Sequence, residues 1–131
     1  MKTKIVCTFA LAATFCLSAA GPALAAPATR LDQGTGTCRL LDQKEMWQGY
    51  QVFKSVCKEC HTRNNDQGAP FLYPEAKTMK SWNRVFTDKY PRCARDGSWE
   101  GLGLEDQLRL NDYLYRHAAD AYDPNSAADC G

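Results

Sequence analysis

Apolar residues recur at steps of three and four in two stretches of the chain, a spacing that predicts amphipathic helices. In the first stretch the recurring positions are Met46, Tyr50, Phe53 and Cys57. Just before them, Asp42 and Glu45 have the spacing of a capping box at the start of a helix. In the second stretch, from about residue 104 to residue 121, one stripe carries Leu104, Leu108, Leu110, Tyr113, Leu114 and His117. A helix is therefore expected near each end of the domain.

A shorter helix is expected between these two. Ser81 is its predicted N-cap, and it should end at Tyr90-Pro91 because the residue before a proline avoids the helical region. Residues 64–70 and 92–103 are rich in turn-forming residues and predict loops. No segment has the alternating pattern of a strand. The pattern therefore predicts an all-α fold, a small bundle of three to four helices.

The first 25 residues have the composition of a signal peptide. A basic start at Lys2 and Lys4 precedes an uncharged apolar run, and Ala23-Leu24-Ala25 has the small-x-small pattern of a cleavage site. The run is shorter than the roughly 20 residues that span a bilayer, so no membrane span is expected after cleavage. Residues 26–41 are expected to be a flexible leader, and residues 42–131 the domain of a periplasmic or otherwise exported protein.

Charge is nearly balanced overall but is separated along the chain. Without Lys2 and Lys4 of the predicted signal peptide, 14 basic and 15 acidic residues remain, a formal net charge of −1 that argues against general nucleic-acid binding. Residues 54–95 hold nine basic and four acidic side chains, whereas residues 96–131 hold two basic and eight acidic ones. If the basic side chains, among them Lys58, Lys77 and Lys80, surround a reactive edge, they would steer an acidic redox partner protein. The alternative is an ordinary solvated surface.

The motif with the clearest chemistry is Cys57-Lys58-Glu59-Cys60-His61, the Cys-x-x-Cys-His pattern of c-type haem attachment. Two thiols at this spacing can each form a thioether with a haem vinyl group, and the adjacent imidazole can ligate the iron. A thioredoxin-like redox pair would need a strand before the motif. A zinc site would need a second pair of ligands at close spacing, and Cys93 and Cys130 are far apart. One covalently bound haem c per chain is therefore predicted.

Around this motif the sequence resembles the class I cytochromes c. Gly49-Tyr-Gln-Val-Phe53 and the motif after it are similar to the family's Gly-x-x-x-aromatic-x-x-x-Cys-x-x-Cys-His signature. Gly68-Ala-Pro-Phe-Leu72 resembles the family's Gly-x-Pro-x-Leu loop, and residues 110–114 resemble its C-terminal helix. The resemblance covers about residues 42–117. It implies a helical bundle wrapped around one haem, with the carbonyl of Pro70 accepting a hydrogen bond from His61.

The resemblance has a further implication where helices meet. An aromatic residue of the last helix, Tyr113, should pack across the first helix. Gly49 fits that arrangement physically, because a missing side chain lets two helix backbones approach closely.

The chain departs from the family at the second axial ligand. Class I members usually place a methionine in the loop before the last helix, and residues 92–103 contain neither methionine nor histidine. Met79 is the expected ligand, with His117 as the second choice, while Met46 is expected in the core. A thiolate from Cys93 and an open sixth position are the remaining possibilities. Histidine–methionine ligation raises the reduction potential, whereas an open site permits small-ligand binding.

Three further cysteines of the mature chain, Cys38, Cys93 and Cys130, are not used by haem attachment. In an exported protein two of them are expected to form a disulfide. Any of the three pairings is possible, and one thiol must remain over.

The sequence as a whole predicts a one-electron carrier and not an enzyme, because no second metal motif or acid–base cluster accompanies the haem motif. Two alternatives stay open. One is a haem-based small-ligand sensor with an open distal site, and the other is a small haem subunit of a larger exported redox complex.

Overall fold

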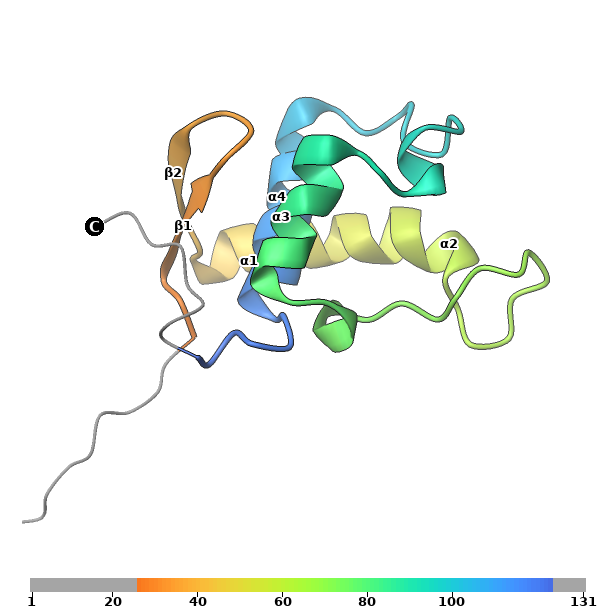
Figure 1. Ribbon diagram of the computed structural model, residues 1–131, viewed down its shortest axis with the longest axis horizontal. Coiled ribbons are helices and arrows are strands. Elements are labelled where there is room, and N and C mark those ends of the chain that lie inside the picture. The colour runs from red at the N-terminus through yellow and green to blue at the C-terminus, as the bar shows by residue number, and fades with distance from the viewer. Residues whose placement is uncertain (1–25, 124–131) are drawn as a thin grey trace, which may run out of the picture.

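The computed structural model describes residues 26–123, so the predicted signal peptide and the C-terminal residues 124–131, with Cys130, lie outside the described part. A mostly helical body carries a two-stranded sheet at one end (Figure 1). In chain order the elements are β1 (Thr29–Asp32), β2 (Thr37–Leu40), α1 (Gln43–Val52), η1 (Phe53–Cys57), α2 (Lys58–Cys60), η2 (Pro74–Ala76), α3 (Met79–Asp88), η3 (Arg92–Ala94) and α4 (Leu104–Arg116). Within residues 26–123, no helix has the length and apolar character needed to cross a membrane.

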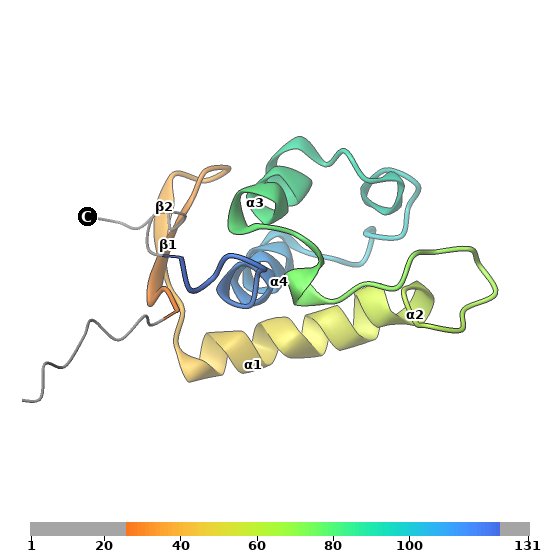
Figure 2. The same ribbon diagram turned by 60° about the horizontal axis from the view of Figure 1, so that its bottom comes forward.

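The elements α1, η1 and α2 follow one another without a break and form one long helix, yellow in Figure 2. It begins as predicted after Asp42, whose carboxylate accepts a hydrogen bond from the backbone N–H of Glu45 at 2.9 Å. The Glu45 side chain pairs with Arg109 of α4 at 3.2 Å. The turn η1 is π-helical, a wide turn that is frequent at functional sites. It leads directly into the Cys-x-x-Cys-His motif.

Gly49 is buried where α1 crosses α4. A Cβ added to Gly49 would lie 2.2 Å from the carbonyl oxygen of Arg109 and 2.6 Å from Cβ of Tyr113. The Tyr113 ring packs against Phe53 and Tyr50, with ring centroids 5.6 and 5.7 Å apart. The close helix crossing and the position of Tyr113 across the first helix are therefore confirmed.

The core lies between α3, α4 and the long helix (Figure 2). On α3 the buried apolar residues are Met79, Trp82 and Val85. This helix starts at residue 79, slightly earlier than predicted, because Thr78 rather than Ser81 is its N-cap and accepts a hydrogen bond from the Ser81 N–H at 3.2 Å. The Trp82 indole N–H donates to the carbonyl of Pro74 at 2.7 Å, which ties the helix to the loop before it.

The predicted apolar stripe of α4 is wrong in part. Leu104 is 65% exposed and His117 is exposed just after the helix, which ends at Arg116 rather than near residue 121. In their place Asn111 and Asp112 are buried beside Leu110 and Leu114. The reason is that α4 contacts the hairpin as well as α1 and α3, and the hairpin supplies charged partners for the buried polar side chains.

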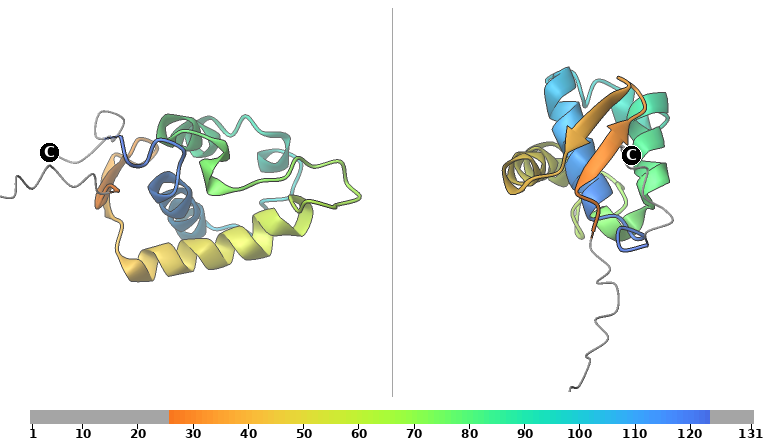
Figure 3. Two further views of the ribbon diagram at one scale, coloured as in Figure 1. Left: turned by 90° about the horizontal axis from the view of Figure 1, so that it is seen from below. Right: turned by 90° about the vertical axis from the view of Figure 1, so that its left-hand side faces the viewer.

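The prediction that residues 26–41 form a flexible leader, and that no strand exists, is also wrong. β1 and β2 pair in antiparallel register, from Thr29 opposite Leu40 to Asp32 opposite Thr37, and the right panel of Figure 3 shows the hairpin lying along α4. The Arg30 side chain is completely buried and bonds the Asp112 carboxylate at 2.8 and 2.6 Å. The buried residues of β1 are Arg30 and Asp32, so a search for apolar alternation does not detect this strand.

Candidate functional site

A cavity of about 230 Å³ opens beside the end of the long helix. The three reactive residues of the motif, Cys57, Cys60 and His61, all line it. The rest of the wall is mainly apolar and comes from η1, α3, α4 and the two loops on either side of α3. Its other members are Val56, Pro70, Leu72, Lys77, Trp82, Val85, Phe86, Tyr90, Pro91, Cys93, Ser98, Trp99, Leu110 and Leu114. The fold therefore places two thiols and an imidazole in one largely apolar chamber.

His61 follows α2 directly, and its ring is oriented by a hydrogen bond. Its Nδ1 lies 2.7 Å from the carbonyl oxygen of Pro70. Because a carbonyl can only accept, Nδ1 is the protonated nitrogen and Nε2 keeps its lone pair for a metal ion. The hydrogen bond that the family resemblance implied for His61 is thus present.

The loop that carries Pro70 is built around Asn65. The Asn65 amide group donates to the carbonyls of Thr62 (2.8 Å) and Ala69 (2.7 Å), and its oxygen accepts from the N–H of Gln67 (3.1 Å) and Ala69 (3.0 Å). Gly68 has a φ of 67°, a left-handed conformation that glycine adopts at little cost. These contacts fix the loop between His61 and Pro70 and hold the acceptor in place.

Lys58, inside the motif, joins the end of the helix to the same loop. Its ammonium group donates to the carbonyl of Leu72 and, at 3.4 Å, to that of His61. It also lies 4.0 Å from the ring centroid of Phe71 and 5.5 Å from that of Phe53. Sequence reasoning treated Lys58 as a surface charge and missed this role, because its carbonyl acceptors carry no sequence signal.

Replacing Lys58 by alanine should lower the free energy of unfolding by about 1–2 kcal/mol, since charge-assisted hydrogen bonds to the loop are lost. Lys54→Ala is the matched control, because Lys54 is exposed one turn earlier on the same helix. Urea unfolding followed by circular dichroism measures both variants. Equal midpoints for the two would show that Lys58 does not brace the loop.

Three of the cysteines are free thiols in the described residues: Cys57, Cys60 and Cys93. Burial raises the pKa of the Cys57 thiol to about 12, with a smaller contribution from nearby Cys93. Burial likewise raises the pKa of Cys93, and Asp96 adds to the effect. Both of these groups are therefore neutral thiols at physiological pH.

Two of the predicted disulfide pairings use Cys93, which is free. The pairing of Cys38 with Cys130 ends on a residue outside the described part and stays a prediction.

The two predicted distal ligands lie elsewhere in the fold. Met79 is 0% exposed in the core, and its backbone N–H donates to Asp120 at 2.7 Å. His117 packs its ring against Tyr113, with centroids 4.9 Å apart. Neither belongs to the cavity wall, whereas Cys93 does. Within residues 26–123, no three His, Cys, Asp or Glu side chains converge as a metal cluster.

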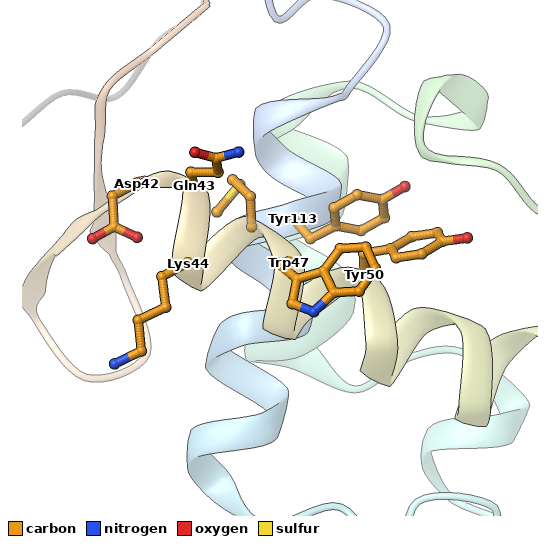
Figure 4. Close-up of a pocket in the computed structure, with 7 residues that line it drawn as sticks. Asp42, Gln43, Lys44, Trp47, Tyr50 and Tyr113 are labelled. Atoms are coloured by element: carbon orange, nitrogen blue, oxygen red, sulfur yellow. The ribbon is translucent and has the colours of Figure 1, made fainter.

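A second hollow is a broad, open groove at the start of α1 (Figure 4). Trp47, Tyr50 and Tyr113 form its aromatic part, and the Trp47 and Tyr50 ring centroids are 5.7 Å apart. Asp42 and Lys44 lie at its edge. Asp42 is engaged as the helix cap, and no cysteine or histidine contributes to this groove. The cavity beside Cys57 is therefore the better candidate for chemistry.

Comparison of the chain with protein-family models, with curated proteins and with solved structures found no match. The functional assignment consequently depends on the residues of the cavity.

Proposed function

We propose that the chain is an exported c-type cytochrome that holds one covalent haem in the cavity and carries one electron at a time. Cys57 and Cys60 provide the two thioether bonds, and His61 provides an axial ligand. The observation that carries the proposal is the His61–Pro70 hydrogen bond at the edge of an apolar cavity that both thiols also line. A Cys-x-x-Cys pair that served as a simple disulfide would need neither the oriented imidazole nor the chamber.

The donor set fits a haem in chemical detail. Cys57 and Cys60 are free, and each thiol can add across a vinyl group, so that sulfur bonds one carbon and the thiol hydrogen passes to the other. This addition needs no oxidant. The hydrogen bond from Nδ1 to Pro70 fixes the tautomer and the orientation of the His61 ring, which leaves the Nε2 lone pair available. Covalent attachment retains the group in a domain too small to hold it strongly by packing alone.

The walls of the cavity decide what the bound group can do. Haem supplies a reversible one-electron couple when bound. Trp82, Phe86 and Trp99 give the cavity an aromatic, apolar wall, and the Phe86 and Trp99 rings stack with centroids 5.2 Å apart. Burial against such a wall tunes the reduction potential of a bound haem. The residues therefore suit electron transfer better than catalysis.

A small-ligand sensor is the second candidate function. It is favoured by the placement of Met79 and His117 outside the cavity wall, because a missing distal ligand would leave the sixth position open to carbon monoxide or a similar molecule.

A redox titration of the purified, haem-loaded protein separates these functions. We expect a reversible one-electron couple and slow carbon monoxide binding in the reduced state. Rapid binding with a high-spin reduced spectrum would favour the sensor. Absence of any reversible couple would contradict the carrier function.

The basic middle of the chain supports an acidic redox partner. Lys54 and Lys80 are exposed, whereas Lys58 is engaged with the loop. Each of the single charge reversals Lys54→Glu and Lys80→Glu should slow electron transfer with an acidic partner about tenfold at low salt, because electrostatic steering is lost.

Lys44→Glu is the control for this experiment, since Lys44 is exposed at the opposite end of the long helix. Stopped-flow rates across a range of ionic strength measure the effect. Equal slowing by Lys44→Glu would show that only the net charge matters.

A further inference from the structure

Cys93 shares the cavity with the three residues of the haem motif. It comes from η3, in the loop between α3 and α4, and reaches the wall from a part of the chain far from Cys57 in sequence. It is partly buried and free. In the proposed function Cys57 and Cys60 form the thioether bonds to haem, and the Cys93 thiol has no assigned role.

The backbone around Cys93 is held by short-range hydrogen bonds. The carbonyl of Pro91 accepts from the Ala94 N–H at 3.2 Å, and that of Arg92 accepts from the Arg95 N–H at 2.9 Å. The Arg95 guanidinium donates to the carbonyl of Tyr90 at 3.0 Å and so links the two ends of the turn. The sulfur is therefore presented on a fixed turn.

The other donor groups of the wall are less suited to iron. The Lys77 ammonium lies over the Trp82 ring at 5.8 Å, and the Lys77 carbonyl accepts from the Ala119 N–H at 3.0 Å. Tyr90 is 42% exposed and its ring packs under the Arg84 guanidinium at 5.7 Å. Ser98 offers a neutral hydroxyl, a weak ligand for iron. A cysteine sulfur is a strong haem ligand, and Cys93 is the one in this wall outside the motif.

We propose that Cys93 is the second axial ligand of the ferric haem, as a thiolate from a different segment of the cavity wall than His61. The inference rests on the proposed covalent haem. Ligation forms a sulfur–iron bond, and the thiol proton passes to solvent; no oxidant is required. The negative charge of the thiolate stabilises the ferric state, so the potential is lower than histidine–methionine ligation would give. The protein is then a low-potential carrier.

Optical and electron paramagnetic resonance spectra of the ferric, haem-loaded protein test this ligation. The parent should show a low-spin spectrum with a sulfur-to-iron charge-transfer band. Cys93→Ser, which keeps the shape of the side chain, should lose that band, and Cys93→Ala should become high-spin and bind added imidazole readily. Both variants should also shift the reduction potential upward. Met79→Leu is the control and should leave the parent spectra unchanged.

The outcomes separate this inference from the proposed function. If haem is covalently attached but Cys93→Ser keeps every feature of the parent spectrum, thiolate ligation is wrong and the cytochrome proposal stands. If Met79→Leu removes the sulfur signature, the ligand is methionine and the inference is likewise overturned. If no haem is attached to the parent, both proposals fail together.

Discussion

Replacing Gly49 by alanine is expected to lower the free energy of unfolding by about 2–3 kcal/mol, although alanine is the better helix former by about 1 kcal/mol. The added Cβ would lie 2.2 Å from the Arg109 carbonyl oxygen and 2.6 Å from the Tyr113 Cβ. Both contacts are with the backbone or with its first side-chain atom, so neither can move away by a rotamer change. The helices α1 and α4 must separate, and the Tyr113 contacts with Phe53 and Tyr50 weaken.

The measurement for Gly49 is urea unfolding followed by circular dichroism. Gly101→Ala is the matched control, because a Cβ there meets nothing within 4 Å. The control should be nearly neutral. A Gly49→Ala protein as stable as the parent would show that α1 and α4 do not cross at this contact.

Replacing Arg30 by alanine should have the larger effect, a loss of about 3–5 kcal/mol, because it removes the buried cation that pairs with the Oδ1 atoms of two buried carboxylates, Asp32 and Asp112. Arg30 bonds Asp112 at 2.6 and 2.8 Å and Asp32 at 2.8 Å, and the Arg30 and Asp112 side chains are both 0% exposed. Arg39 still reaches the other Asp112 oxygen at 2.6 Å. Loss of this size is a large fraction of the 5–15 kcal/mol that stabilises a typical domain.

The loss in free energy of unfolding caused by Arg30→Ala should depend on pH. Burial raises the pKa of Asp112 even with both guanidinium groups present. Without Arg30 this pKa rises further, so the folded variant takes up a proton more readily than the unfolded chain does. Its stability relative to the parent should therefore recover as the pH falls from 7 towards 4 and be lost again as the pH rises.

Thermal unfolding of Arg30→Ala across this pH range measures both the size of the loss and its sign. Arg92→Ala is the control, because the Arg92 side chain is 93% exposed beside Asp96. It should change stability by less than about 0.5 kcal/mol. A deficit that grows in acid would contradict the assigned role of Asp112.

Local chemistry made part of this structure predictable. Asp42 is a helix cap whose partner lies three residues away, so its role is readable from the sequence. Gly49 and Tyr113 were predicted to meet because the family resemblance supplied a long-range pairing that periodicity alone does not contain. The His61–Pro70 contact has the same origin.

The hairpin could not be predicted in this way. Its stability comes from Arg30 and Asp112, which are 82 residues apart, and a buried charge looks like a surface charge in the sequence. Because Asp112 is buried through its pairing with Arg30 and Leu104 is exposed, the apolar residues of α4 alone do not identify its buried face.

In the candidate site, too, some residues could be predicted from the sequence and others could not. Cys57, Cys60 and His61 are adjacent in sequence, so their convergence was expected. The sequence favours Met79 as the distal ligand because it is a methionine between the haem motif and the last helix, but the first turn of α3 buries it in the core. A loop cysteine such as Cys93 can be free, form a disulfide or bind a metal, so the sequence alone does not single it out. Only the folded loop shows that it lines the same cavity as His61.

The most direct test of the account is the mass of the mature protein purified from an export-competent host that makes c-type cytochromes. The intact mass should exceed that of the polypeptide by one haem, the colour should survive acid–acetone extraction, and the added mass should map to the peptide holding Cys57 and Cys60. A Cys57→Ala/Cys60→Ala double variant should lose it. A parent protein with the mass of the polypeptide alone, or with a disulfide between these two cysteines, would contradict the haem assignment.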